Sequence, residues 1–189
     1  MNPEQFLEIL HLCEKLKNNT RHADTSSGRR ESVAEHCWRL TLMAFFLEED
    51  YPHLDMHRVM QMCLIHDLGE AFTGDKPVFE KTEADCQREA ESYRNWIATL
   101  PPTLSRRMAA LCDEMEARQT PEAKLYKALD RLEALIQHNE SPISTWLPLE
   151  YDLQKTYGWE DCRDDPYLKA LREAVLRETL EKIAQNQQS

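Results

Sequence analysis

The chain has 189 residues, of which 41% are hydrophobic and 30% are charged, a balance typical of a soluble globular protein. Its formal net charge of −11 repels nucleic-acid phosphates and anionic membranes, so we expect neither a nucleic-acid polymer nor a membrane as partner. Only four glycines are present, which excludes the glycine-rich phosphate loops of dinucleotide-binding and P-loop folds. No apolar run approaches the ~20 residues of a membrane span, and the N-terminus has no signal-peptide core, so we expect a cytoplasmic protein.

Apolar residues recur at helical spacing along almost the whole chain, and the prolines fall between the periodic segments. In the first half this spacing predicts helices over about 4–18, 32–50 and 55–70, with a polar stretch containing Gly28 before the second. The second helix opens on Ser32-Val-Ala-Glu35, a capping box in which each polar side chain binds the other residue's backbone amide.

The second half continues the helical pattern, and each segment has a recognisable start or stop signal. The expected segments are a charged helix over about 80–99, a helix capped by Thr103, a helix opened by Thr120-Pro121, a short helix ending at Gly158 and a last helix opened by Asp165-Pro166. No stretch alternates in the manner of a strand. We therefore predict an all-α bundle of seven or eight helices, one domain over 1–189 with a core of about 5–160 and a C-terminal helix of about 165–186.

Two histidines, His36 and His66, each lie on the apolar stripe of a predicted helix and should point inward. Asp67 follows the second at once, and an acid in such a setting needs a cation, several hydrogen-bond donors or a metal as partner. Imidazole nitrogens and carboxylate oxygens are ordinary ligands of divalent metals, so one ion would satisfy all three residues. The alternative is a pair of core histidines hydrogen-bonded to their neighbours.

Two further acids, Glu70 and Asp75, follow within ten residues of His66. Glu70 is four positions after His66, so on a continuous helix it would lie one turn further along the same face. The C-terminal end of a helix is already the negative pole of its dipole, and this concentration of carboxylates there favours a bound cation. The alternative is that both are solvated surface acids.

Three segments together resemble the HD-domain metal-dependent phosphohydrolases, and most closely the branch of bacterial 5′-deoxynucleotidases and related eukaryotic HD-domain proteins. These segments are Arg29-Arg-Glu-Ser-Val-Ala-Glu-His36, His66-Asp67-Leu-Gly-Glu70-Ala-Phe-Thr-Gly-Asp75 and Lys124-Leu-Tyr-Lys127-Ala-Leu-Asp130. They occur in the family's order and separations over roughly residues 5 to 160. The resemblance implies an all-α fold and hydrolysis of the phosphomonoester of a nucleoside 5′-monophosphate, often by a homodimer.

The resemblance also implies one divalent metal, Mn²⁺, Co²⁺, Mg²⁺, Zn²⁺ or Fe²⁺, held by His36, His66, Asp67 and Asp130. Asp130 is assigned by the resemblance alone, because it lies off the apolar stripe of its helix and periodicity indicates a surface acid. No histidine occurs between Asp67 and Asp130, whereas the two-iron branch of the superfamily needs extra histidines in that interval. A single metal is therefore expected.

The remaining roles are carried over in the same way. Glu70, with Asp67 beside it, is the predicted catalytic acid/base that orients or deprotonates the attacking water. Arg21 is expected to bind the phosphate through its guanidinium fork, and Asp75, after Gly74, to contact the sugar hydroxyl. His22 is expected at the substrate as well, although the relatives place a tryptophan there. Two alternatives stay open: an HD-fold phosphodiesterase or nucleoside triphosphate hydrolase, and a non-catalytic nucleotide-binding module.

Overall fold

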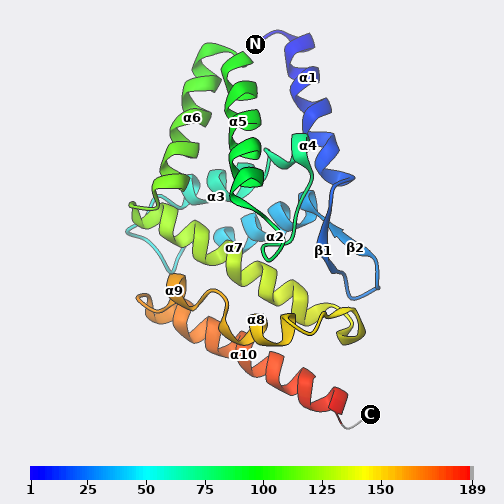
Figure 1. Ribbon diagram of the computed structural model, residues 1–189. Helices are drawn as coiled ribbons and strands as arrows, with labels where there is room; N and C mark the ends of the chain where they lie inside the picture. Colours follow the sequence, from blue (N-terminus) through cyan, green and yellow to red (C-terminus); the bar gives the residue numbers. More distant parts are fainter. Residues whose placement is uncertain (188–189) are drawn as a thin grey trace.

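The computed structural model describes residues 1–187 and confirms the predicted all-α class (Figure 1). The helices are α1 (Pro3–Glu14), α2 (Val33–Phe46), α3 (Met56–Ile65), α4 (Glu70–Thr73), α5 (Glu83–Thr99), α6 (Pro102–Ala117), α7 (Pro121–Glu140), α8 (Glu150–Thr156), α9 (Trp159–Cys162) and α10 (Pro166–Gln187). Two 3₁₀ turns, η1 (Lys15–Lys17) and η2 (Ile143–Thr145), and two short strands, β1 (Thr20–Asp24) and β2 (Arg30–Ser32), complete the described part.

Local capping signals set most helix starts. The capping box of α2 is present, since Glu35 donates its amide to Ser32 Oγ at 3.2 Å and its carboxylate accepts the Ser32 amide at 2.9 Å. Thr120 caps α7 through the Ala123 amide at 3.2 Å. The predicted Thr103 cap is wrong: α6 already begins at Pro102, because a proline lacks the amide proton that the first helical turn would leave unpaired.

The polar stretch before α2 is a β-hairpin, which corrects the prediction that no segment forms a strand. β1 and β2 pair antiparallel, with Thr20 opposite Ser32 and Asp24 opposite Arg30, and the register is irregular between them. The intervening turn contains Gly28 at a φ of +80°, a conformation that glycine adopts without steric cost. The C-terminal end of α7 fixes the hairpin from outside, since Gln137 Nε2 donates to the Asp24 carbonyl at 2.7 Å and Ser141 Oγ, just past the helix, donates to it at 2.6 Å. Strands this short carry no alternating pattern, so contacts distant in sequence decide their conformation.

The third predicted helix ends earlier than its apolar pattern indicates. α3 stops at Ile65, and the backbone amides of Leu68 and Glu70 bond three residues back, at 3.2 and 3.0 Å, in a tightened turn. Gly69 lets this turn pack closely against α5, because a Cβ there would lie 3.1 Å from Cγ of Glu89. The sequence predicted that Glu70 would lie on the His66 face of one continuous helix. Instead, Glu70 is the first residue of the separate helix α4.

α7 is the central element of the fold. It crosses the middle of the molecule in Figure 1, with α1, α5 and α6 on one side and α8, α9 and α10 on the other, and it packs against α2, α3, α6, α9, α10 and β1. Its residues Ala128, Leu129 and Leu132 are fully buried. Within the described residues, no helix is long and apolar enough to cross a membrane.

Candidate metal and phosphoester site

The four residues predicted as metal ligands lie together between α2, the end of α3 and α7. One ligating atom each of His36, His66 and Asp67 lies within 4.8 Å of the other two. Asp130 Oδ1 is 3.1 Å from His36 Nε2 and 3.5 Å from His66 Nε2, and its side chain is only 14% exposed. Periodicity alone predicted a surface acid there. The flank of α7 that carries Asp130 instead faces both histidines.

The proton positions on the two imidazoles favour a cation between them. His66 Nδ1 lies 3.0 Å from the Cys63 carbonyl oxygen, which can only accept, so Nδ1 carries a proton and a lone pair for a metal can come only from Nε2. Within the described residues His66 Nε2 is buried without a hydrogen bond, although Asp67 Oδ2 is 3.0 Å away. Burial opposes the imidazolium form, but Asp67, Tyr126, Cys37 and Asp130 together outweigh burial and raise the pKa of His66 well above its ordinary value, so without a cation Nε2 holds a proton that a metal would displace. A divalent cation would satisfy these lone pairs directly, so the donor set fits a metal.

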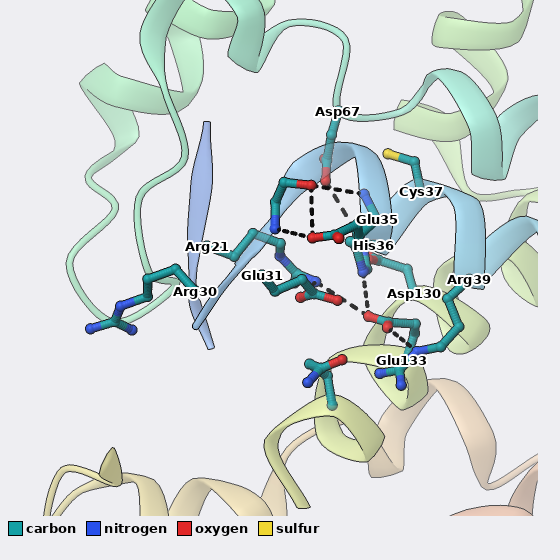
Figure 2. A network of polar contacts seen from close by, with 12 residues as sticks. Arg21, Arg30, Glu31, Glu35, His36, Cys37, Arg39, Asp67, Asp130 and Glu133 are labelled. Atoms are coloured by element: carbon teal, nitrogen blue, oxygen red, sulfur yellow. Dashed lines mark hydrogen bonds and ion pairs between the residues drawn. The ribbon is translucent and has the colours of Figure 1, made fainter. Parts of the chain in front are cut away.

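Glu133, which the sequence analysis did not single out, orients the other imidazole (Figure 2). Its carboxylate is fully buried and accepts from His36 Nδ1, so His36 Nε2 is the nitrogen that faces Asp130 and is left for a metal. Burial disfavours the charged carboxylate, but His36 and two arginines hold the pKa of Glu133 at about 2. The sequence could have indicated this role, because Glu133 lies one helical turn after Asp130 and therefore on the same face of the helix.

Two arginines and a second acid complete this buried network. Arg39 Nε donates to Glu133 Oε1 at 2.7 Å, and Arg21 Nη1 lies 3.2 Å from both Glu133 and Glu31. In Figure 2, Arg21 extends from the hairpin toward the two glutamates. Burial, and then the charge of Glu133, raise the pKa of Glu31 to about 7. The arginines thus compensate carboxylates that could not otherwise stay ionised in the interior.

A cavity of about 250 Å³ opens beside the cluster. Among its lining residues are all the predicted site residues except the two histidine ligands, namely Arg21, His22, Asp67, Glu70, Asp75 and Asp130. Lys127, part of the third sequence segment that resembles the family, also lines the wall, and sequence reasoning missed three further cations there, Lys76, Lys81 and Arg131. Apolar side chains such as Phe79, Leu135 and Leu153 line another part. The cavity therefore offers both charged and apolar surface to a ligand.

Comparison with known proteins agrees with this geometry. The family model described as the HD domain matches residues 13–171. The chain belongs to the HD-domain family.

Among its relatives, 5′-deoxynucleotidase HDDC2 of Homo sapiens is 30% identical over 139 residues, which are 71% of this chain and 67% of the human protein. A crystal structure of a predicted metal-dependent phosphohydrolase from Magnetospirillum magnetotacticum MS-1 is 30% identical, with a TM-score of 0.81 over 95% of this chain and 93% of that one. The Cyanophage S-2L HD phosphohydrolase DatZ, bound to dA and one catalytic Zn²⁺ ion, shares the fold at 22% identity, with a TM-score of 0.60 over 91% of this chain and 96% of that one.

In this HD domain Glu70 is a buried acid at the cavity wall. It is 4% exposed, and its Oε2 has no hydrogen-bond partner among the described residues. Burial, and then the charges of Asp67 and Asp75, raise the pKa of Glu70 to about 10. A cation at the ligand cluster would act in the opposite direction. Glu70 is thus a carboxyl group whose protonation depends on the charge beside it.

The predicted substrate residues occupy different parts of the HD-domain cavity. Arg21 is anchored through Nη1 by the two buried glutamates, and its side chain is 18% exposed. His22, the next residue of β1, packs edge-on against Phe79 with ring centroids 5.5 Å apart. Asp75 follows Gly74, whose φ of +75° an ordinary side chain rarely adopts. Burial raises the pKa of Asp75, and Arg21 opposes that shift.

Proposed function

We propose that this HD-domain protein is a metal-dependent phosphohydrolase that cleaves nucleoside 5′-monophosphates, with deoxynucleotides among its substrates, to nucleoside and phosphate. One observation carries the proposal: a cluster of two imidazoles and two carboxylates with converging ligand atoms opens onto a cavity that is charged beside the cluster and apolar beyond it. Relatives named 5′-deoxynucleotidase at about 30% identity support it.

His36, His66, Asp67 and Asp130 would hold the metal. A divalent ion bound there supplies positive charge that polarises a phosphoryl oxygen and makes a bound water more acidic. The protein's own residues prepare this set before any ion arrives. Cys63 and Glu133 fix the proton on Nδ1 of each imidazole, and Lys127, 2.6 Å from Asp130 Oδ2, holds that carboxylate in place.

Glu70 is the proposed proton acceptor, because it lines the cavity beside Asp67 and one of its carboxylate oxygens has no partner in the described part of the chain. In its ionised form that oxygen can orient the attacking water and take its proton. Glu70 then carries the proton that the departing sugar oxygen requires. Asp67 has a second proposed role in catalysis, since it both belongs to the ligand set and lines the cavity.

Arg21 is the proposed phosphate-binding residue. Its anchorage on Glu31 and Glu133 fixes the guanidinium before the substrate arrives, which lowers the entropic cost of binding. Asp75 is proposed to accept a hydrogen bond from a sugar hydroxyl, and His22 to contact the sugar and base with a smaller, more polar ring than an indole.

The charge balance of the cavity favours a monophosphate over a triphosphate. Each remaining lining cation already has a carboxylate partner within the chain: Lys76 with Asp85, Lys81 with Glu89, Lys127 with Asp130, and Arg131 with Asp161. A triphosphate would bring several negative charges into a wall with no surplus of positive ones. We therefore propose monophosphate hydrolysis as the main activity, ahead of triphosphate or phosphodiester hydrolysis.

The test is phosphate release from ribo- and deoxynucleoside monophosphates, with a nucleoside triphosphate and a cyclic dinucleotide as comparison substrates. Mn²⁺, Co²⁺, Mg²⁺, Zn²⁺ and Fe²⁺ are each added to metal-free protein, with chelator as the control. We expect release from monophosphates that at least one ion supports and chelator abolishes. Activity confined to triphosphates or diesters, or activity that persists in chelator, would contradict the proposal.

A homodimer and a cytoplasmic location are also proposed, on the family resemblance and the composition. Sedimentation velocity of the full chain tests the first, and cell fractionation tests the second.

A further inference from the structure

The cavity follows one face of α7 away from the metal cluster. Lys127, Asp130 and Arg131 line its charged end, Ala134 and Leu135 come next, and His138 follows one turn later. Asp130 and His138 are eight residues apart, which at ~1.5 Å per residue corresponds to about 12 Å along the helix. This is the length scale on which a nucleotide separates its phosphate from the far edge of its base.

The end of the cavity near His138 also contains an acidic residue, Glu150. Glu150, at the start of α8, is 5% exposed and lines the cavity. Its Oε2 accepts the Leu147 amide at 2.6 Å, and its Oε1 lies 3.3 Å from His22 Nε2. His138 Nε2 is 3.6 Å from Glu150 Oε2 and, within the described residues, is buried without a hydrogen-bond partner. A buried polar atom with no partner beside a cavity indicates a place for a ligand atom.

The electrostatics of this end are those of a hydrogen-bond acceptor. The ring of His138 stacks on Trp146, with centroids 4.5 Å apart. Burial, and then the charges of His22 and Lys182, lower the pKa of His138 to about 4, so the imidazole is neutral near neutral pH. Because His138 is neutral, the charged group that Glu150 presents to a ligand is not balanced by that imidazole. A carboxylate accepts hydrogen bonds and repels carbonyl oxygens.

We propose that Glu150 and His138 form a base-reading subsite that selects nucleobases with an exocyclic amino group. The inference rests on the function proposed above and adds the class of base. The amino groups of adenine, guanine and cytosine can donate to the Glu150 carboxylate. In one neutral tautomer His138 Nε2 donates to N1 of adenine or N3 of cytosine, and in the other it accepts from N1–H of guanine. Thymine and uracil present carbonyl oxygens on both sides of their single ring N–H, and these face the carboxylate unfavourably. Leu135 and Phe79 provide apolar surface between the two ends.

The experiment measures binding and hydrolysis separately. Calorimetric titration of the full chain gives dissociation constants for deoxyadenosine, deoxyguanosine, deoxycytidine, thymidine and deoxyinosine, and phosphate release is measured with the five monophosphates. We expect nucleosides with an amino group to bind about 10-fold or more tightly than thymidine, the usual scale for one hydrogen bond to a charged acceptor. Deoxyguanosine should exceed deoxyinosine, which lacks only the amino group, by a similar factor.

Glu150→Gln should reduce both ratios toward unity, because an amide can donate to a carbonyl oxygen and accept from an amino group. Asp152→Asn is the matched control on the same helix, since that side chain is 85% exposed and does not line the cavity. Equal binding of thymidine and the amino nucleosides by the wild-type protein overturns the inference, whether or not Glu150→Gln folds. Selective binding without phosphate release supports the subsite and contradicts the proposed function instead.

Discussion

The Glu133 carboxylate accepts the Nδ1 proton of His36 at a position where neither side chain is exposed to solvent. The same carboxylate oxygen lies 3.2 Å from Arg21 Nη1. One buried group therefore sets both the lone pair that His36 offers to a metal and the position of the arginine proposed to bind phosphate. Removing Glu133 would take this buried acceptor from His36 and Arg21 at once.

Replacing Glu133 with glutamine should weaken metal binding without removing a ligand. The amide is a poorer acceptor and can turn its N–H toward His36, so the imidazole is no longer held with its lone pair toward Asp130. Loss of such an outer partner typically costs about 10- to 100-fold in metal affinity. Calorimetric titration of Mn²⁺ into metal-free protein measures this, with Glu140→Gln as control because Glu140 is exposed and, among the residues that the structure describes, pairs only with Arg39. Unchanged affinity in a folded Glu133→Gln protein would show that His36 needs no such partner.

Replacing Glu70 with glutamine should separate catalysis from metal binding. The amide keeps the shape but cannot accept a proton, so turnover should fall by about 10²-fold or more while metal content stays the same. The raised pKa of Glu70 means that the metal-free protein already buries a neutral group there, so its unfolding temperature should change little. Glu80→Gln, in the exposed loop before α5, is the control. Near-normal turnover would assign Glu70 a structural role.

Replacing Arg21 with lysine should raise KM more than it lowers kcat. An ammonium keeps the charge but loses the planar fork that binds two phosphate oxygens, and we expect KM to rise by about 10-fold. Metal content should be retained, because His36 keeps its bond to Glu133 and Arg39 still compensates that carboxylate. Steady-state kinetics on a nucleoside monophosphate test this, with Arg30→Lys, an exposed side chain at the start of β2, as control. Equal KM values for wild type and Arg21→Lys would place the phosphate elsewhere.

His138 should make folding stability depend on pH. Its folded-state pKa of about 4 lies below the ordinary 6.5, so between these values the native protein binds fewer protons than the unfolded chain. The stabilising contribution of the neutral ring is complete above pH 6.5 and is lost as the pH falls toward 4. The expected loss between pH 7 and pH 5 is on the order of 2 kcal/mol.

Urea denaturation in chelator at both pH values measures this change in the free energy of unfolding. His138→Gln should lack that component, so its stability should fall less than that of the wild type on acidification. His57→Gln, at an exposed position on α3, should follow the wild type. Parallel pH profiles for wild type and His138→Gln would contradict the assignment.

The sequence by itself determined the helices and the inward direction of two histidines. Capping residues act on amides within three positions, and apolar spacing selects a helix face, so the starts of α2 and α7 and the burial of His36 were predictable locally. The resemblance to HD-domain sequences added Asp130, which no local pattern indicated.

Only the tertiary structure decided the hairpin, the turn that separates Glu70 from α3, and the partners of the histidines. Asp130 reaches His36 across 94 positions and Glu133 does so across 97, so these contacts depend on how α7 packs against α2. Glu150 meets His22 and His138 for the same reason, since three separate elements bring them together. Local patterns record which face of an element is buried. They do not record which buried polar groups meet there, because that depends on the docking of whole helices.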